Sequence, residues 1–227
     1  DYYSYNFEGS FRSIETYLNS NIRIGWLSNF VENYTFEKGI IELCEIALNQ
    51  FSAAEKKILI EQCNIKIDPD KLWEIWCNLR SKITFDDLSS MRIQNFEELG
   101  FPVKWEYEQG EKIKEADISN AINHYLKDRS YVDGLFDKYD FLALPSAQLF
   151  PFDKEIDFPK SIQETQMDTY HRWMEVTVFA SMFQLPTISV PVGFNEKGLP
   201  MGMQLIGKNK SDDKVIHICL LYTSDAA

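Results

Sequence analysis

The stretch TYHRWMEVTVFASMFQLPTISVPVGFNEKGLPMGMQLIG, residues 169–207, decides the fold because its apolar periodicity changes from helical to strand-like within a short segment. Four apolar residues recur at roughly helical spacing: Met174, Val178, Met182 and Leu185. Pro186 ends that predicted helix, and strands are predicted at 187–190 and 201–206 around a polar turn at 195–198. Since both strands carry few charges, we expect a hairpin inside a sheet covered on both faces, within an α/β core.

Upstream of this stretch, the pattern is mainly helical. Amphipathic helices are predicted at 37–51, 70–82 and 117–136. The third has its expected inward face at Ile118, Ala121, Ile122, Tyr125 and Leu126. Glu106 and Glu108 alternate with Trp105 and Tyr107, which indicates a strand with one wet face rather than an acid–base pair. The span from about 52 to 136 therefore reads as a helical insertion into a sheet-containing domain.

Four motifs resemble the closing half of the amidase signature hydrolases and follow one another in that family's order. They are IRIGWLSNF at 22–30 with FEKGIIELCEIAL after it, YDFLALPSAQLFPFD at 139–153, LPTISVPVGF at 185–194 and GLPMGMQLIG at 198–207. The resemblance implies an α/β fold with a mixed sheet flanked by helices. One departure is Phe183-Gln184, where many members have Ala-Gly, and it is expected to alter how the preceding helix packs on the sheet.

The resemblance also implies a mechanism whose residues this chain does not contain. Members of the family hydrolyse or transfer amides through a lysine, a serine that relays the proton and a nucleophilic serine that forms an acyl-enzyme. The last two lie in a Gly- and Ser-rich segment, because backbone N–H groups must approach the oxyanion closely. This chain has no Gly-Gly pair, and its single Ser-Ser pair, Ser89-Ser90, is predicted to be a solvated helix start or turn.

The two ends suggest why those residues are absent. The chain opens at Asp1 without a methionine, and 219–227 (CLLYTSDAA) looks like a translated sequencing adapter. We therefore expect residues 1–218 to be the C-terminal portion of a single amidase domain whose catalytic residues lie upstream. On this interpretation the chain by itself is inactive, and the whole enzyme needs no cofactor.

The resemblance places five substrate-binding candidates on two segments. Gln148 and Phe150 follow the predicted strand, where loops commonly border the pocket of an α/β sheet. Tyr170, Trp173 and Thr177 belong to the predicted helix. Ser146 and Phe152 lie on the same loop as the first two, and the apolar side chains suggest a hydrophobic or aromatic amide, although core packing explains them equally well. Asp168 and His171, three apart on the predicted helix, are interpreted as a capping or surface pair.

Composition limits the remaining classes of function. A net charge of −12 opposes nucleic-acid binding, and no apolar run is long enough for a membrane helix, so a cytoplasmic protein is expected. No HExxH or CxxC motif suggests a metal, and Cys44, Cys63 and Cys77 are interpreted as reduced, packed thiols. Besides a small-molecule amide hydrolase, two alternatives remain: one subunit of a glutamine-dependent amidotransferase, or a non-catalytic binding protein on a shortened amidase fold. The resemblance leaves a homodimer open.

Overall fold

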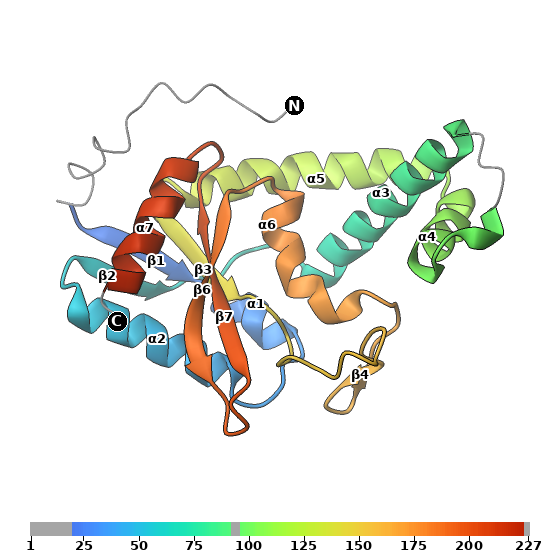
Figure 1. Ribbon diagram of the computed structural model, residues 1–227. Coiled ribbons are helices and arrows are strands. Elements are labelled where there is room, and N and C mark those ends of the chain that lie inside the picture. Colours follow the sequence, from blue (N-terminus) through green and yellow to red (C-terminus); the bar gives the residue numbers. More distant parts are fainter. Residues whose placement is uncertain (1–19, 92–95, 225–227) are drawn as a thin grey trace. The chain divides into compact units, whose positions relative to one another are not determined.

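The computed structural model describes residues 20–91 and 96–224, which form two compact units (Figure 1). The first unit contains a five-stranded sheet in the order β2-β1-β3-β7-β6. Its strands are β1 (Ile22–Trp26), β2 (Ile58–Gln62), β3 (Phe141–Pro145), β6 (Thr187–Phe194) and β7 (Pro200–Gly207). Strands β2, β1 and β3 are mutually parallel, whereas β7 runs antiparallel to both of its neighbours, β3 and β6. The predicted α/β class with a mixed sheet is confirmed.

Helices and short elements complete the first unit around this sheet. They are α1 (Ser28–Asn33), α2 (Ile40–Ala54), β4 (Ser161–Ile162), β5 (Thr165–Gln166), the 3-10 helix η3 (Arg172–Thr177), α6 (Val178–Met182) and α7 (Asp212–Ser224). The α2 helix packs against β2, β3, β6 and β7 through its predicted apolar face, so Cys44, Leu48 and Phe51 are buried. Every residue of β3 is buried, as expected for a central strand. The loop that carries Gln148 and Phe150 follows this strand.

The second unit, Lys66–Val132, is helical. It contains α3 (Pro69–Ser90), η2 (Phe96–Glu98), α4 (Phe101–Lys112) and most of α5 (Glu115–Leu135). Asp68 caps α3 because its carboxylate accepts the backbone N–H groups of Asp70 and Lys71. Strand β2 falls within the range predicted to be helical, but it pairs with β1 and belongs to the sheet.

Three local predictions for this helical region were wrong. Glu106 and Glu108 lie on helix α4 rather than on a strand, and Glu106 is buried. On α5, Ile122 and Leu126 were predicted to face inward, yet they are 44% and 58% exposed. The short alternation at Trp105–Glu108 fits a helix as well as a strand, and tertiary packing decided between them. Ser89-Ser90 is solvated as predicted but ends α3 instead of starting a helix.

The predicted hairpin forms as β6 and β7, but β6 is the edge strand of the described sheet. Thr187, Ser189 and Pro191 are exposed on it, so the expected cover on both faces is wrong for β6. Pro191 and the register shift after it limit further pairing, which is how edge strands avoid aggregation. The preceding helix is also shorter than predicted, because η3 takes Arg172–Thr177 and α6 ends at Met182.

Helix α7 continues through residues 219–224, part of the stretch predicted to be adapter-derived; residues 225–227 and 1–19 lie outside the described residues. Tyr222 is buried, packs edge-on against Phe51 and donates to the Pro191 carbonyl at 2.7 Å. The adapter origin of 219–227 stays a prediction. Among the described helices, none combines the length and the apolar character that a membrane span needs.

The cysteines of the core are free thiols with little access to solvent. Cys44 and Cys63 are buried, and Cys77 is half-buried. Burial raises the pKa of the Cys44 thiol to about 12, with a smaller contribution from the Glu45 carboxylate. At neutral pH this side chain is therefore a neutral thiol that packs as a small apolar group, as the sequence predicted.

Gln184 adopts a left-handed backbone conformation, with φ of 53°, just after α6. A residue with a side chain is strained by about 1–2 kcal/mol in this region. Glycine avoids that strain, but it loses more conformational entropy on folding, which offsets part of the gain. We expect Gln184→Gly to raise the free energy of unfolding by about 0.5–1 kcal/mol in chemical denaturation. The matched control is Gln50→Gly inside α2, before its last turn, which should lower the free energy of unfolding by about 1 kcal/mol. A loss of stability in both variants would contradict the strain assignment.

Candidate functional site

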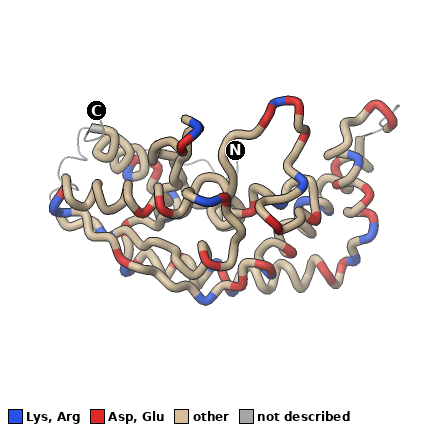
Figure 2. The backbone as a smooth tube through the Cα atoms, turned by 90° about the horizontal axis from the view of Figure 1, so that it is seen from below, with Lys and Arg blue, Asp and Glu red and all other residues tan. Residues whose placement is uncertain are grey.

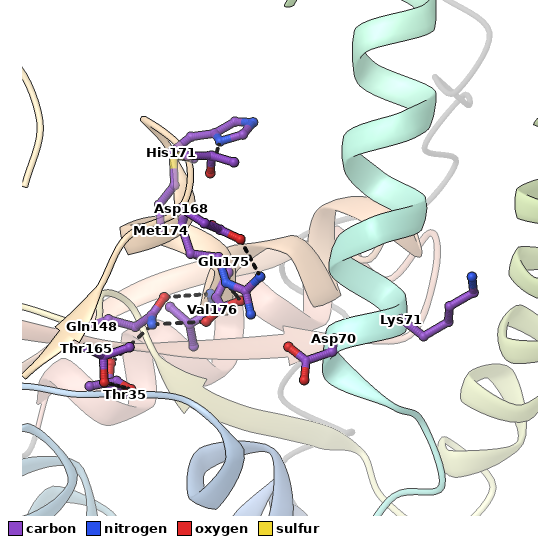
Figure 3. A network of polar contacts seen from close by, with 12 residues as sticks. Thr35, Asp70, Lys71, Gln148, Thr165, Asp168, His171, Met174, Glu175 and Val176 are labelled. Atoms are coloured by element: carbon purple, nitrogen blue, oxygen red, sulfur yellow. Dashed lines mark hydrogen bonds and ion pairs between the residues drawn. The ribbon is translucent and has the colours of Figure 1, made fainter. Parts of the chain in front are cut away.

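The loop that leaves β3 is attached to η3 by the buried amide of Gln148 (Figure 3). Its Nε2 donates to the Thr35 carbonyl at 3.1 Å and to Glu175 Oε1 at 3.4 Å, while its Oε1 accepts the Val176 N–H at 3.2 Å. Since Gln148 has no exposed surface, its amide serves these contacts. The side chain fixes the loop against the segment that carries the other candidate residues.

A buried carboxylate extends this network. Glu175 is 5% exposed, and its Oε2 lies 2.6 Å from Nε of Arg172, three residues earlier on η3. The same guanidinium lies 3.7 Å from Asp168 Oδ2 (Figure 3). Arg172 thus bridges a buried and an exposed carboxylate. A buried carboxylate is retained at such a position only when it is paired and hydrogen-bonded.

Strand β7 contributes a second buried amide to the same junction. Gln204 Nε2 donates to the Pro145 carbonyl at 2.8 Å and to the Val176 carbonyl at 3.4 Å. Ser146, the first residue after β3, shares a 2.6 Å hydrogen bond with Ser189 of β6. The β3 loop, η3, β7 and β6 are therefore joined by side-chain hydrogen bonds at one end of the sheet.

The β3 loop and the segment around η3 also carry aromatic side chains. Phe152 and Trp173 make an edge-to-face contact with ring centroids 5.5 Å apart, and Phe152 is 37% exposed. The Trp173 indole N–H donates to the Tyr170 carbonyl, and the Tyr170 ring stacks on His171. We call Phe152, Tyr170 and Trp173 the aromatic lip. Its side chains are partly exposed, so the lip presents apolar surface to solvent next to the β3 loop.

The structure brings the five predicted substrate residues into one region but gives them different environments. Gln148 and Phe150 are buried, and the Phe150 N–H donates to Glu37 Oε2 at 2.7 Å. Tyr170 and Trp173 are partly exposed on the aromatic lip. Thr177 is half-buried, and its hydroxyl donates to the Met174 carbonyl at 2.8 Å. Their roles toward a substrate stay predictions, since burial favours positioning for the first two and contact for the others.

Sequence reasoning missed Glu175, Arg172 and Glu37. Each belongs to an ordinary charged stretch, and no spacing rule marks a carboxylate that becomes buried only in the tertiary structure. Asp168 and His171 do not lie on a helix as predicted, since they occupy the turn before η3. His171 is buried and its Nδ1 lies 2.8 Å from Thr169 Oγ1, so the interpretation as a surface pair is wrong for His171.

An open hollow of about 610 Å³ lies between the start of α2 and the tip of the β6–β7 hairpin, and it shares Phe150 with the candidate residues. Phe150, Phe194 and Leu43 supply apolar surface there, while Glu42 and Lys197 supply charge. Within the described ranges, no group of three or more His, Cys, Asp or Glu side chains is placed to hold a metal ion. Acidic and basic residues are interspersed along the backbone instead of gathering on one segment (Figure 2).

We expect Gln148→Leu to lower the free energy of unfolding by about 2 kcal/mol, because it leaves buried partners on Thr35, Glu175 and Val176 unsatisfied. Urea denaturation followed by circular dichroism measures the change. Gln50→Leu, an exposed position on α2, is the matched control and should stay within about 0.5 kcal/mol. Equal effects for the two variants would show that the buried amide network contributes nothing.

The family model described as Amidase matches residues 8–216. A glutamyl-tRNA(Gln) amidotransferase subunit from Prochlorococcus marinus (strain MIT 9312) is 35% identical over 98 residues, which cover 43% of this chain and 19% of that protein. The corresponding subunit from Zymomonas mobilis is 36% identical over 87 residues, covering 37% of this chain and 16% of that protein.

Solved structures of the same fold are more distant in sequence. A bacterial aryl acylamidase of the amidase signature family superposes with a TM-score of 0.80 at 20% identity, over 98% of this chain and 47% of that chain. The glutamyl-tRNA(Gln) amidotransferase subunit from Thermotoga maritima gives 0.59 at 23% identity, over 86% and 40%. The chain thus spans under half of these two structures and about a fifth of the curated relatives.

Proposed function

Because the chain belongs to the amidase signature family, we propose that it forms the C-terminal part of a hydrolase that cleaves a carboxylic amide through a serine acyl-enzyme. The match of the family model over 8–216 carries this proposal. The lysine and the two serines of the reaction come from residues outside this chain. In support, the chain has no Gly-Gly pair, and its single Ser-Ser pair lies exposed at the end of α3.

The proposed reaction has two steps. A serine hydroxyl attacks the amide carbonyl, its proton passes through the second serine to the nitrogen, and the amine leaves as the acyl-enzyme forms. Water then attacks the ester and releases the carboxylic acid, which restores the serine. Neither step needs a redox partner or an organic cofactor. The role of this chain is to bind and orient the substrate.

The aromatic lip supports an apolar or aromatic group on the substrate. Phe152 and Trp173 meet edge-to-face while part of their surface stays accessible, which suits contact with a flat or aliphatic group. Tyr170 and Thr177 border the same region. Gln148 and Phe150, which are buried, would hold the β3 loop in position. We propose that these five residues together form one wall of the substrate cleft.

A second candidate function is that of an amidotransferase component, and one observation favours it. The curated relatives quoted above are both components of a glutamyl-tRNA(Gln) amidotransferase, at 35% and 36% identity over their matched residues. In such an assembly ammonia from an amide would pass to a partner protein instead of being released. The hydrolase remains preferred because the aromatic lip offers apolar surface to a substrate side chain.

The test begins with the gene on intact DNA, read outward past the codons for Asp1 and Ile218. An in-frame lysine and a Gly-Ser-Ser-Gly-like segment are expected upstream. The longer protein should hydrolyse aryl anilides and lose that activity with a serine-directed reagent, while the 227-residue chain should not exceed a blank. Serine-dependent hydrolysis by the 227-residue chain itself would overturn the proposal. A start codon directly before Asp1 would favour the non-catalytic binding protein.

A separate measurement distinguishes hydrolase from amidotransferase. In the longer protein, Trp173→Ala should raise KM for an aryl anilide by about tenfold with a smaller change in kcat, since it removes binding surface. Glutaminase activity that appears only with a co-purifying partner protein, together with no anilide hydrolysis, would favour the amidotransferase. The control is Phe101→Ala, which alters an exposed aromatic on α4 of the second unit.

A further inference from the structure

Helix α5 carries an apolar stripe that its own unit leaves uncovered. Ile122 and Leu126 are 44% and 58% exposed, and Ile118, one turn earlier, is half-buried. These residues are spaced four apart, so they lie on one face of the helix. Ala121 and Val132 are the buried residues of α5. Within the second unit the extensive helix contact is between α3 and α4, and α5 takes no part in it.

The two ends of the same stripe carry charged residues of opposite sign. Glu115 lies three residues before Ile118, and Arg129 lies three residues after Leu126. The spacing along the stripe is therefore three, four, four and three, which keeps all five side chains on one helix face. Measured from Ile122, Glu115 and Arg129 are each seven residues away, and Ile118 and Leu126 are each four away. Around Ile122 the stripe therefore has an apolar residue four positions away on each side and a charged residue of opposite sign seven positions away on each side.

We propose that α5 is a self-association surface on which two copies of this chain pair their α5 helices antiparallel, with the two-fold axis at Ile122. In that arrangement Glu115 faces the partner's Arg129, and Ile118 packs against the partner's Leu126. Both contacts occur twice, because a two-fold interface uses the same patch on each protomer. A parallel pairing would bring Glu115 against the partner's Glu115 and is disfavoured by charge repulsion.

Charge complementarity is the reason to choose a second copy as the occupant. A stripe recognised by an unrelated protein needs no symmetry of its own, whereas self-pairing requires that each end complement the other. The spacing of Glu115 and Arg129 about Ile122 meets that requirement. Glu115 is exposed, and Arg129 is half-buried with its Nη1 3.5 Å from the Tyr125 hydroxyl, so the partner's carboxylate would join a contact that Arg129 already makes within α5. A single pair of helices buries little area, so the association is expected to be reversible and concentration-dependent.

Sedimentation velocity of the 227-residue chain from micromolar to hundreds of micromolar tests the proposal. The wild-type chain should show a monomer–dimer equilibrium. Each of Glu115→Arg and Arg129→Glu should weaken it at least about tenfold, because each places like charges at both ends of the interface. The double variant restores opposite charges and should recover most of the wild-type affinity. This recovery separates a specific antiparallel contact from general loss of solubility.

An apolar variant and its control complete the test. Ile122→Glu places two carboxylates at the two-fold axis and should leave the chain monomeric, whereas Ile46→Glu on α2, an equally exposed isoleucine of the first unit, should not change the dimer. Circular dichroism confirms that the helices remain. A monomeric wild-type chain over the whole range, a dimer unaffected by Ile122→Glu, or a charge-swapped double variant no better than the singles would each overturn the proposal.

Discussion

Phe183→Ala is expected to lower the free energy of unfolding by about 3–5 kcal/mol, the usual cost of removing a fully buried aromatic ring. Phe183 is 0% exposed at the end of α6 and packs edge-to-face on Phe179, with centroids 5.4 Å apart. Phe179 in turn contacts Phe30 of α1 at 5.4 Å. The ring therefore connects α6 to the core beside the sheet. This part of the core is therefore built around the large side chain of Phe183.

The matched control for that variant is Phe194→Ala on the β6–β7 hairpin. Phe194 is 67% exposed, so its truncation should change stability by less than about 0.5 kcal/mol. Urea denaturation monitored by circular dichroism gives both values. If Phe183→Ala cost no more than Phe194→Ala, the ring would lie in space that the core can close without loss, and the aromatic cluster would contribute little.

Phe183 and Gln184 occupy two different environments at the end of α6. Phe183 is in the core, and Gln184 takes the left-handed conformation suited to glycine. Whether they alter the packing of the helix relative to other family members stays a prediction. The Gln184 carbonyl is held by Asn209 Nδ2 at 2.8 Å. The chain thus forms the turn between α6 and β6 with a non-glycine residue at its left-handed position.

The parts of the fold that the sequence predicted are those with long or unbroken patterns. Helix α2 and most of α3 follow from their apolar spacing, and β3 follows from a continuous buried run. Strand β2 was missed because its charged Glu61, which pairs with Arg23 and Lys138, interrupts the apolar run. The outward face of α5 could not be predicted, because periodicity locates an apolar stripe without saying what covers it.

The candidate site was predictable only as a location. The position of Gln148 after a buried strand indicated the correct loop, but its complete burial depends on Thr35 and Val176, which are far from it in sequence. Glu175 gave no signal because a lone glutamate in a helical segment is normally solvated. Loop positions follow from the sheet pattern, whereas the partners of a buried polar group follow from tertiary contacts.

Gly110→Ala is expected to separate α3 from α4, at a cost of about 3 kcal/mol, the upper end of the usual range for overpacking. A Cβ atom at Gly110 would lie 2.2 Å from the Ser81 carbonyl oxygen and 2.5 Å from Phe85 Cβ, both on α3. The nearest obstacle is backbone, so no rotamer change relieves the overlap and a helix must move. One turn earlier, Glu106 accepts the Ser81 hydroxyl and the Arg80 guanidinium, contacts that the same displacement would break.

Gly134→Ala is the control because this glycine also lies in a helix, α5, but a Cβ there would meet nothing within 4 Å. Alanine has the higher helix propensity, so this variant should be neutral or stabilising by up to about 1 kcal/mol. Hydrogen exchange is the measurement of choice, because it reports on α3 and α4 separately from the sheet. Faster exchange confined to α3 and α4 in Gly110→Ala is the expected result. Unchanged protection would mean that the helices accommodate a methyl group and that their close approach at Gly110 is not required.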